Sequence, residues 1–261
     1  ARMRLNHSMW KRAMENVSLR EGVMISHFEM LSDWQWYRRR GGSDTNTAKI
    51  FFTNWIPMLA PATPHIAEEF WSKMGGKGMV SELVIKELSP LDSDIIPLAK
   101  ESYLRNLIGN SRNVKGLAQR HSETPISSCI IQTAADWKNN LASIALSLHA
   151  RNFNFKKEGS EYIKSLDIFS DEKLRGEIFQ TWQSLTFGNK KSRGKIYTWS
   201  EGEISLITSQ FDETELINDN ADFIAHALSV NSVISYKVGD GDDVAGKARV
   251  ASPLDPGIAF I

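Results

Sequence analysis

The sequence contains one cysteine, Cys129, so no disulfide can form within the chain and no zinc site built on several cysteines is available. A chain without disulfides is typical of a reducing compartment. The sequence also lacks an apolar run of about 18 residues and a charged leader followed by an apolar segment, which are the patterns of a membrane span and a secretory signal. We therefore expect a cytoplasmic protein without a membrane partner.

Signatures of catalysis are missing as well. The six histidines show no metal-ligand spacing, and no serine has the flanking glycines of a nucleophile elbow. The segment Gly241–Ala248 approaches a phosphate-binding loop, but Ala248 stands where magnesium requires Ser or Thr. In addition, Asp242 and Asp243 would repel a phosphate. We expect no catalytic residue, no metal site and no bound cofactor in this chain.

What the sequence does contain is enough apolar material for a folded core. Its 261 residues are 41% hydrophobic and 24% charged, which is ordinary globular usage. The formal net charge is zero, yet basic residues outnumber acidic ones by 17 to 12 up to Arg120, whereas 3 basic residues face 11 acidic ones from Ile196 onward. The chain begins at Ala1 without an initiator methionine, so we expect a piece of a longer protein.

Apolar residues recur at three- and four-residue intervals through the first 120 residues, which is the helical period. One interruption is expected at Gly22, and Arg38–Arg40 before Gly41 indicate a helix end. The predicted helical segments are Leu5–Arg40, Thr45–Leu59, Pro64–Met74 and Asp92–Arg120.

The residue pattern changes at Pro125. A run rich in β-branched residues follows and predicts a strand, and a helix is predicted after it from Asp136 to about His149. The later predicted elements are helices at Gly159–Leu166, Ser170–Phe187 and Thr214–Val230, and strands at Ser232–Val238 and Ile258–Ile261. The polar segment Gly188–Lys195 is the expected hinge. The predicted fold is mainly α, with a helical bundle at 1–120, an α/β connector at 121–195 and a small C-terminal α/β domain at 196–261.

Aromatic and basic residues alternate at the end of the first long helical segment. Arginines pair with phosphates and aromatic rings stack on unpaired bases, so Trp36, Arg38, Arg39 and Arg40 are candidate RNA-binding residues. Lys49 is expected to assist them. The competing interpretation is a helix end whose tryptophans are core and whose arginines are solvated.

The segment from Phe52 to Trp71, which includes Pro61, Pro64 and His65, resembles the LLAPFTPHIAEELW segment of class I aminoacyl-tRNA synthetases for branched aliphatic amino acids. There it is a corner between two helices, so Thr63 is expected to cap the second helix and Ile66 and Phe70 to pack into the bundle. Further segments are similar to the archaeal and eukaryotic leucyl type, namely Tyr37–Gly41, Ile130–Lys138 and the closing run from Lys247 to Ile258.

The resemblance implies a C-terminal part of a leucyl-type synthetase, with an anticodon-binding helical domain and an additional C-terminal domain. The family's adenylation signatures are absent here, so ATP with magnesium, leucine and the editing site belong to an N-terminal part that this chain could contact. The implied partner is tRNA(Leu) and not DNA. The C-terminal domain of the archaeal type reaches the long variable arm, which makes Phe260 and Ile261 candidate tRNA-binding residues.

Three alternatives remain open. The last strand could merely complete a small sheet with Ser232–Val238. The whole chain could be a helical protein-interaction module of a synthetase assembly. It could also be the tRNA-binding part of a valyl- or isoleucyl-type enzyme, although the α/β tail and the lack of cysteine clusters oppose this.

Overall fold

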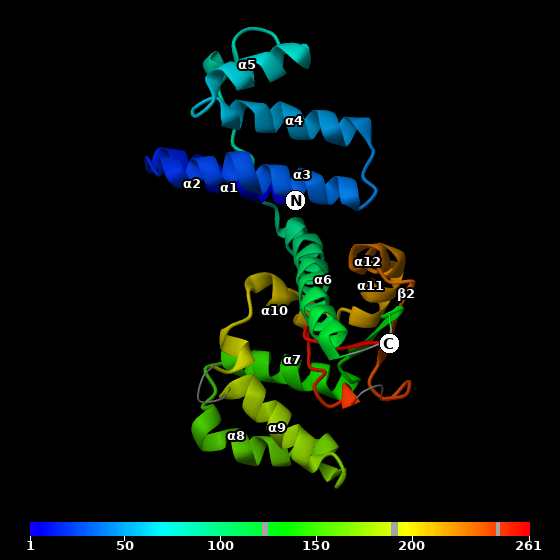
Figure 1. Ribbon diagram of the computed structural model, residues 1–261. Coiled ribbons are helices and arrows are strands. Elements are labelled where there is room, and N and C mark those ends of the chain that lie inside the picture. Colours follow the sequence, from blue (N-terminus) through cyan, green and yellow to red (C-terminus); the bar gives the residue numbers. More distant parts are fainter. Residues whose placement is uncertain (122–124, 189–192, 244–245) are drawn as a thin grey trace. The chain divides into compact units, whose positions relative to one another are not determined.

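Figure 1 shows the computed structural model of the chain, which describes residues 1–121, 125–188, 193–243 and 246–261. The chain divides into two compact units, Ala1–Pro97 and Leu98–Ile261, which we call the helical unit and the mixed unit. Within the described residues, no helix combines the length and the apolar character that a membrane crossing requires. The mainly α fold with a small α/β part is confirmed.

The helical unit consists of helices joined by short turns. Its elements are α1 (Arg2–Glu15), α2 (Leu19–Val23), the π-helix η1 (Met24–Glu29), α3 (Met30–Arg39), α4 (Thr45–Leu59), α5 (Pro64–Lys73), η2 (Val80–Glu82) and η3 (Asp92–Asp94). α4 and α5 begin where the sequence predicts, because Asp44 caps α4 through a bond from the Thr47 N–H (2.6 Å) and Pro64 occupies the first turn of α5.

The long helical run before Arg40 is interrupted elsewhere than predicted. The break lies at 16–18, where Val17 has φ = +57°, whereas Gly22 is helical and buried. The π-helix η1 then shifts the face that points inward. Ile25 and Met30 are buried, and Phe28 and Leu31 of the predicted apolar stripe are exposed. An inserted π-turn rotates every later side chain, and the 3.6-residue period cannot reveal it.

The segment that resembles the synthetases forms a corner between α4 and α5, as the resemblance implies. The side chains that pack at this corner differ from those expected. Ala67 is the fully buried residue of α5, while Ile66 and Phe70 are 48% and 45% exposed, so their predicted packing is wrong. Thr63 is the N-cap residue of α5, as predicted, but its side chain makes no capping hydrogen bond. Its hydroxyl donates to the Leu59 carbonyl (3.2 Å) and lies 3.2 Å from His27 Nε2, which ties the corner to η1.

The mixed unit surrounds a three-stranded sheet of order β2-β1-β3. Its elements are α6 (Ile95–His121, whose first turn belongs to the helical unit), β1 (Ser128–Thr133), α7 (Asp136–Ala150), α8 (Phe155–Lys164), η4 (Asp167–Ser170), α9 (Arg175–Thr186), η5 (Lys195–Tyr197), α10 (Glu201–Thr208), α11 (Glu213–Asp219), α12 (Ala221–Leu228), β2 (Ser232–Lys237) and β3 (Gly257–Phe260). β1 runs parallel to β2 and antiparallel to β3.

Helices α7, α8 and α9 enclose the core of the mixed unit around Trp182, Leu141 and Ile163. Three predicted helices differ from the structure: α8 begins at Phe155 and not at Gly159, α9 begins at Arg175 and not at Ser170, and Thr214–Val230 is two helices separated at Asn220. Because β1 pairs with both later strands, residues 121–195 and 196–261 share one sheet. The domain limits at 120 and 195 stay predictions.

The predicted hinge Gly188–Lys195 includes residues 189–192, which lie outside the described residues. On its C-terminal side, Gly194 is buried, and a Cβ there would lie 2.5 Å from the backbone carbon of Thr186. Lys195 Nζ donates to Ser252 Oγ (2.6 Å) and lies 3.2 Å from Asp255 Oδ2. This side of the segment is therefore packed against α9 and bonded to the C-terminal segment.

The C-terminal segment 246–261 is held by groups far away in the sequence. Lys138, buried on α7, donates to the Ala251 carbonyl (2.7 Å), and burial lowers the pKa of this lysine. Glu213, at the start of α11, accepts hydrogen bonds from the Leu254 N–H and from the Tyr103 hydroxyl (3.2 Å). These bonds position the residues that lead into β3.

Glu213 is an ionisable group in an apolar setting. Burial raises its pKa to about 7, against the opposing effect of the two hydrogen bonds it accepts. From its usual value of 4.5 up to about pH 7, the folded protein holds a proton that the unfolded chain has released. The free energy of unfolding therefore falls as the pH rises through this window, by an amount of order 3 kcal/mol.

We expect Glu213→Gln to remove this pH dependence, because glutamine can accept from Leu254 N–H and bond Tyr103 without ionising. Urea unfolding followed by tryptophan fluorescence from pH 5 to pH 8 measures it. Glu215→Gln, on the exposed side of the same helix, is the control and should retain the wild-type slope. Equal slopes in Glu213→Gln and the wild type would contradict the expectation.

Candidate nucleic-acid interface

The end of α3 presents the predicted basic residues in a fixed geometry. Arg38 and Arg39 lie in its last turn, and Gly41 follows with φ = +84°, the left-handed conformation of a helix C-cap. The Gly42 N–H donates to the Tyr37 carbonyl (2.9 Å), and the Arg38 guanidinium donates to the Gly42 carbonyl (2.9 Å). The predicted helix end near Arg40 is confirmed.

The aromatic residues around this end have separate roles. Trp34 packs inward against Phe51 and Phe52, with ring centroids 5.1 and 4.7 Å apart, as the core interpretation requires. Trp36 is half-buried, and the Arg39 guanidinium lies 5.5 Å from its ring centroid, a cation–π distance. Trp36 and Arg39 thus form one aromatic and cationic pair at the surface.

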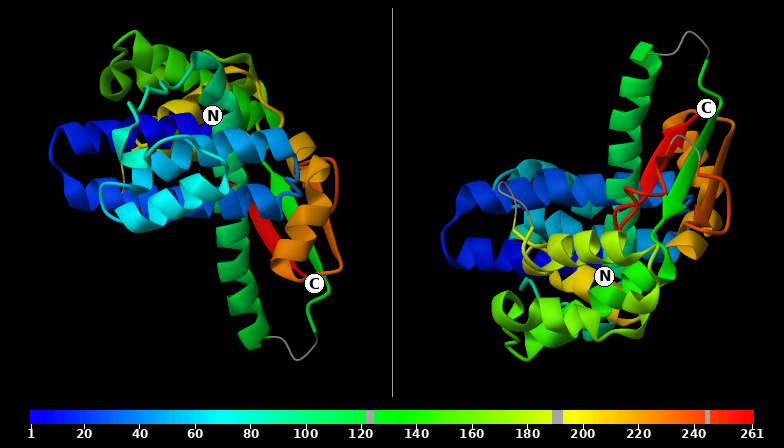
Figure 2. Two further views of the ribbon diagram at one scale, coloured as in Figure 1. Left: turned by 90° about the horizontal axis from the view of Figure 1, so that it is seen from above. Right: turned by 90° about the horizontal axis from the view of Figure 1, so that it is seen from below.

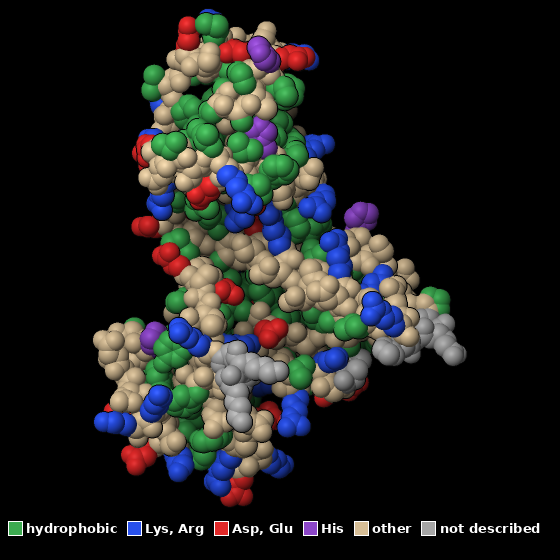
Figure 3. Space-filling model, turned by 60° about the vertical axis from the view of Figure 1, so that its left-hand side comes forward, with side chains coloured by type: hydrophobic (Ala, Val, Ile, Leu, Met, Phe, Trp, Pro, Cys, Tyr) green, Lys and Arg blue, Asp and Glu red, His purple; other side chains and the backbone are tan. Residues whose placement is uncertain are grey.

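Lys49 is exposed near the start of α4, directly after the loop that leaves α3. The contact of Trp34 with Phe51 and Phe52 pairs the two helices, so Lys49 lies at the same end of the pair as Arg38, Arg39 and Arg40. Arg38 and Arg39 are exposed, and Arg40 is half-buried. On the face shown in Figure 3, Lys and Arg side chains are scattered among other residues, which favours local contacts over one continuous basic surface.

The last strand completes one small sheet with Ser232–Lys237, as the structural alternative expects, although the two strands are not neighbours in it. β3 lies against β1, with Phe260 opposite Cys129, and not against Ser232–Lys237, which forms the opposite edge of the sheet. The Ile261 N–H donates to the Ser128 carbonyl (3.0 Å), and the Ile261 carbonyl accepts from the N–H groups of Ser127 (2.8 Å) and Ser128 (3.0 Å). In Figure 2 the C-terminus lies beside the start of β1.

This pairing decides which groups of the last two residues are available. In an antiparallel pair the backbone groups alternate in direction, so those of Ile261 face β1 and those of Phe260 face the other edge of β3. The side chain of Ile261 is 57% exposed, and that of Phe260 is half-buried. The Ile261 side chain and the Phe260 backbone are therefore the groups of these two residues that remain available to a partner. The roles of all seven predicted residues stay predictions.

The groups rejected as catalytic are structural where the structure describes them. Cys129 is fully buried in β1, and burial raises its pKa to about 12, which suits a small core residue. His7 is buried, and burial lowers its pKa. Among the described residues, no three His, Cys, Asp or Glu side chains gather as metal ligands would.

Sequence reasoning missed the residues that position the C-terminal strand. Glu213, Tyr103 and Lys195 act through contacts between residues 41 to 110 positions apart, which no local pattern reports. Lys138 belongs to a segment that resembles the synthetase family. Its buried hydrogen bond to the Ala251 carbonyl shows that this segment holds the C-terminal segment in place. Among these four residues, only Lys138 lies in a segment that the sequence had singled out by its resemblance.

Comparison with known proteins finds similarity to tRNA ligases. The family model described as the anticodon-binding domain of tRNA ligase matches residues 8–130. The chain is 27% identical over 258 residues to the leucine–tRNA ligase of Methanococcus maripaludis strain C7, which covers 94% of this chain and 22% of that protein. It is 26% identical to the leucine–tRNA ligases of Pyrococcus abyssi and Methanocaldococcus jannaschii, covering 95% and 94% of this chain and 23% of each of those proteins.

The chain thus spans less than a quarter of the length of these relatives. The similarity extends beyond the anticodon-binding domain into the sheet and the C-terminal segment, because it covers nearly the whole chain. The chain is therefore similar to archaeal leucine–tRNA ligases along nearly its whole length, and its residues 8–130 match the anticodon-binding domain of tRNA ligase.

Proposed function

We propose that this chain is the tRNA-binding C-terminal part of a leucine–tRNA ligase, and that it docks tRNA(Leu) for aminoacylation performed elsewhere in the enzyme. The observation that carries the proposal is similarity to leucine–tRNA ligases along nearly the whole chain, including the anticodon-binding domain. The names of these relatives favour leucine over the valyl and isoleucyl alternatives. A cytoplasmic location follows from this role.

In this proposal the helical unit contacts the tRNA body and the C-terminal strand contacts the long variable arm. Exposed Arg38, Arg39 and Lys49 support the first contact, because guanidinium and ammonium groups position phosphates without reading bases. The 57% exposed Ile261 supports the second, because an apolar side chain packs on an unstacked base. The acidic balance of the last quarter of the chain favours a contact limited to a few groups there.

ATP and magnesium belong to the full-length enzyme in this proposal. The segment 241–248 does not fit a triphosphate, since Asp243 Oδ1 accepts from the Ala248 N–H (2.7 Å) where a phosphate oxygen would accept. The Asp242 carbonyl is taken by Gln132 Nε2 (3.0 Å) and by the Tyr236 hydroxyl (2.6 Å). Residues 244–245 of this segment lie outside the described residues.

The helical unit also exposes apolar side chains that a catalytic part of the enzyme could cover. Phe28 of η1 is 59% exposed, and Ile66 and Phe70 of α5 are exposed as well. The His27–Thr63 contact joins η1 to the start of α5, so these side chains belong to neighbouring elements. Exposed apolar surface of this kind favours a protein contact. A module for synthetase assembly would use the same surface, and tRNA binding distinguishes the two functions.

The first expectation is that the purified chain shifts a tRNA(Leu) transcript in a gel, and that a transcript without the variable arm binds more weakly. Valine and isoleucine tRNAs serve as controls and should also bind more weakly. Binding should fall steeply with salt, because phosphate contacts release counterions. No shift at low salt would contradict the proposal and favour the protein-interaction alternative.

Replacing Arg38, Arg39 and Arg40 together by alanine should weaken tRNA binding and flatten its salt dependence. Each lost phosphate contact reduces the slope of log K against log salt by about 0.9. The matched control removes three exposed lysines of the mixed unit, Lys156, Lys164 and Lys173, and should leave the slope close to wild type. If both triple variants flatten the slope equally, the arginines contribute only general charge.

Ile261→Ala tests the terminal contact without disturbing the backbone pairing of Ile261 with β1. The side chain is mostly exposed, so the melting temperature should stay within about 2 °C of wild type. Affinity for tRNA(Leu) should drop, while affinity for the transcript without a variable arm should not change. Ile234→Ala, a 54% exposed isoleucine on β2 at the opposite edge, is the control. A lower melting temperature with unchanged affinity would assign Ile261 a structural role.

A further inference from the structure

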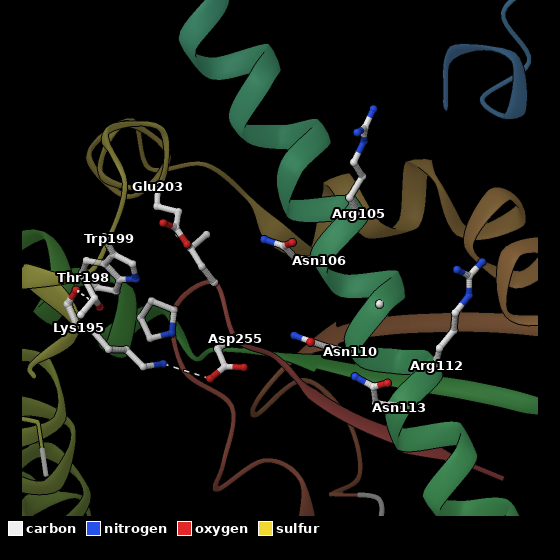
Figure 4. Close-up of a pocket in the computed structure, with 13 residues that line it drawn as sticks. Arg105, Asn106, Asn110, Arg112, Asn113, Lys195, Thr198, Trp199, Glu203 and Asp255 are labelled. Atoms are coloured by element: carbon white, nitrogen blue, oxygen red, sulfur yellow. Dashed lines mark hydrogen bonds and ion pairs between the residues drawn. The ribbon is translucent and has the colours of Figure 1, made fainter. Parts of the chain in front are cut away.

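The mixed unit contains a polar hollow that none of the predicted residues lines. It has a volume of about 780 Å³ and lies between one face of α6, the segment around η5 and the start of α10, and residues 253–255 of the C-terminal segment (Figure 4). Pockets for small molecules occupy about 300–1,000 Å³, so a nucleotide would fit. Its lining is mainly polar, which argues against an apolar ligand.

The α6 wall carries a row of carboxamides. Asn106, Asn110 and Asn113 follow each other at four and three residues and are exposed, and no described residue bonds their side chains. In Figure 4 the amides of Asn106 and Asn110 point toward the opposite wall. Carboxamides both donate and accept hydrogen bonds, as base edges and ribose hydroxyls require.

The residues of this row lower the intrinsic stability of helix α6. Asparagine and glycine are poor helix formers, and Gly109 lies within the same face. A Cβ at Gly109 would meet nothing within 4 Å, so packing does not require glycine there. The face therefore lacks a structural reason for its composition, whereas close approach of a ligand to the helix backbone supplies one.

The opposite wall carries one aromatic ring and two carboxylates that already have partners within the protein. Trp199 is half-buried, with part of its surface packed on the core of the unit and part lining the hollow. Glu203 is bound to the Ser200 N–H (2.8 Å) and hydroxyl (2.7 Å), and Asp255 is paired with Lys195 at 3.2 Å. Two carboxylates on this wall would repel a phosphate but accept from a base amino group.

The cations of α6 lie at the rim. Arg105 precedes the asparagine row and Arg112 lies between Asn110 and Asn113. The two arginines are seven residues or about 10.5 Å apart along the helix and point away from the hollow in Figure 4. Arg112 Nη2 donates to the Ala227 carbonyl (3.1 Å), which fixes its position. Phosphates would therefore contact the rim while a base enters.

We propose that this hollow binds one unstacked nucleotide of the tRNA, with its base beside Trp199, its base edge and ribose on the α6 asparagines, and its phosphates at Arg105 and Arg112. The inference rests on the proposed function and adds to it a contact in the mixed unit that is separate from Ile261. Base stacking on an aromatic ring and hydrogen bonds from carboxamides are uncharged contacts, so most of the effect is independent of salt.

The decisive variant is the triple substitution Asn106→Ala, Asn110→Ala and Asn113→Ala in the full chain. Alanine is the better helix former, so the melting temperature should stay equal or rise. Affinity for a tRNA(Leu) transcript should fall at least fivefold with an unchanged salt slope. The control, Gln119→Ala with Asn140→Ala, removes exposed helical carboxamides outside the hollow and should bind as the wild type does.

Two further variants separate the contributions. Trp199→Ala should lose affinity and Trp199→Phe should recover most of it, because phenylalanine keeps a stacking face. Arg112→Gln should reduce the salt slope by about one, unlike the asparagine variant. Chemical probing of the tRNA ribose should show one nucleotide that is protected by the wild-type chain and reactive with the triple asparagine variant.

The outcomes distinguish this inference from the proposed function. If the wild-type chain binds tRNA(Leu) and the triple asparagine variant binds equally well, the hollow is not a nucleotide site while the proposed function stands. If the asparagine variant loses affinity together with melting temperature, its effect is structural and the inference is overturned. If the wild-type chain does not bind tRNA at all, both fail together.

Discussion

The double pairing of β1 is the constraint on which the arrangement of the mixed unit depends. β1 is bonded in parallel to β2, about 100 residues later, and antiparallel to β3, about 130 residues later. The helices from α7 to α12 form the connection that a parallel pair requires. The same pairing fixes Ile261 through three backbone hydrogen bonds with Ser127 and Ser128. A terminal residue held in this way can present its side chain without the disorder that chain ends usually show.

Strand pairing alone does not hold the segment that precedes β3, and buried polar groups complete the attachment. Lys138 and Glu213 each lose hydration by burial, and each recovers hydrogen bonds to the backbone of residues 251–254. An uncompensated charge at either site would destabilise the fold, so both residues can stay buried only while the C-terminal segment is docked. The segment also forms one wall of the hollow on α6, and its docking therefore shapes that hollow.

The sequence predicted correctly the helix ends that are set by residues within one turn of the end. α4 and α5 were predicted closely because Asp44, Pro61 and Pro64 act within one turn, and the end of α3 because Gly41 does. Errors arose where contacts between residues far apart in the sequence determine which side chains are buried. The π-helix at Met24–Glu29 changed which residues face inward, and Glu213 became buried through contacts with Tyr103 and Leu254. The last strand joined the sheet of Ser232–Lys237 as expected, but the position of β1 between the two strands had no signal in the sequence. The candidate cations were found from the sequence, whereas the asparagine row required the opposite wall to be seen.

In the proposed function, charge and stacking divide the tRNA contacts into two kinds with different physical consequences. The cations at the end of α3 interact through Coulomb forces that salt screens, so they favour any phosphate backbone equally. Ile261 and the asparagine face with Trp199 are uncharged, and they can discriminate by shape and hydrogen bonding because an unsuited group leaves their polar atoms unpaired. An acidic C-terminal quarter is then compatible with the proposed tRNA binding: weak attraction there would reduce binding to other RNAs, and selectivity would come from contacts that depend on fit.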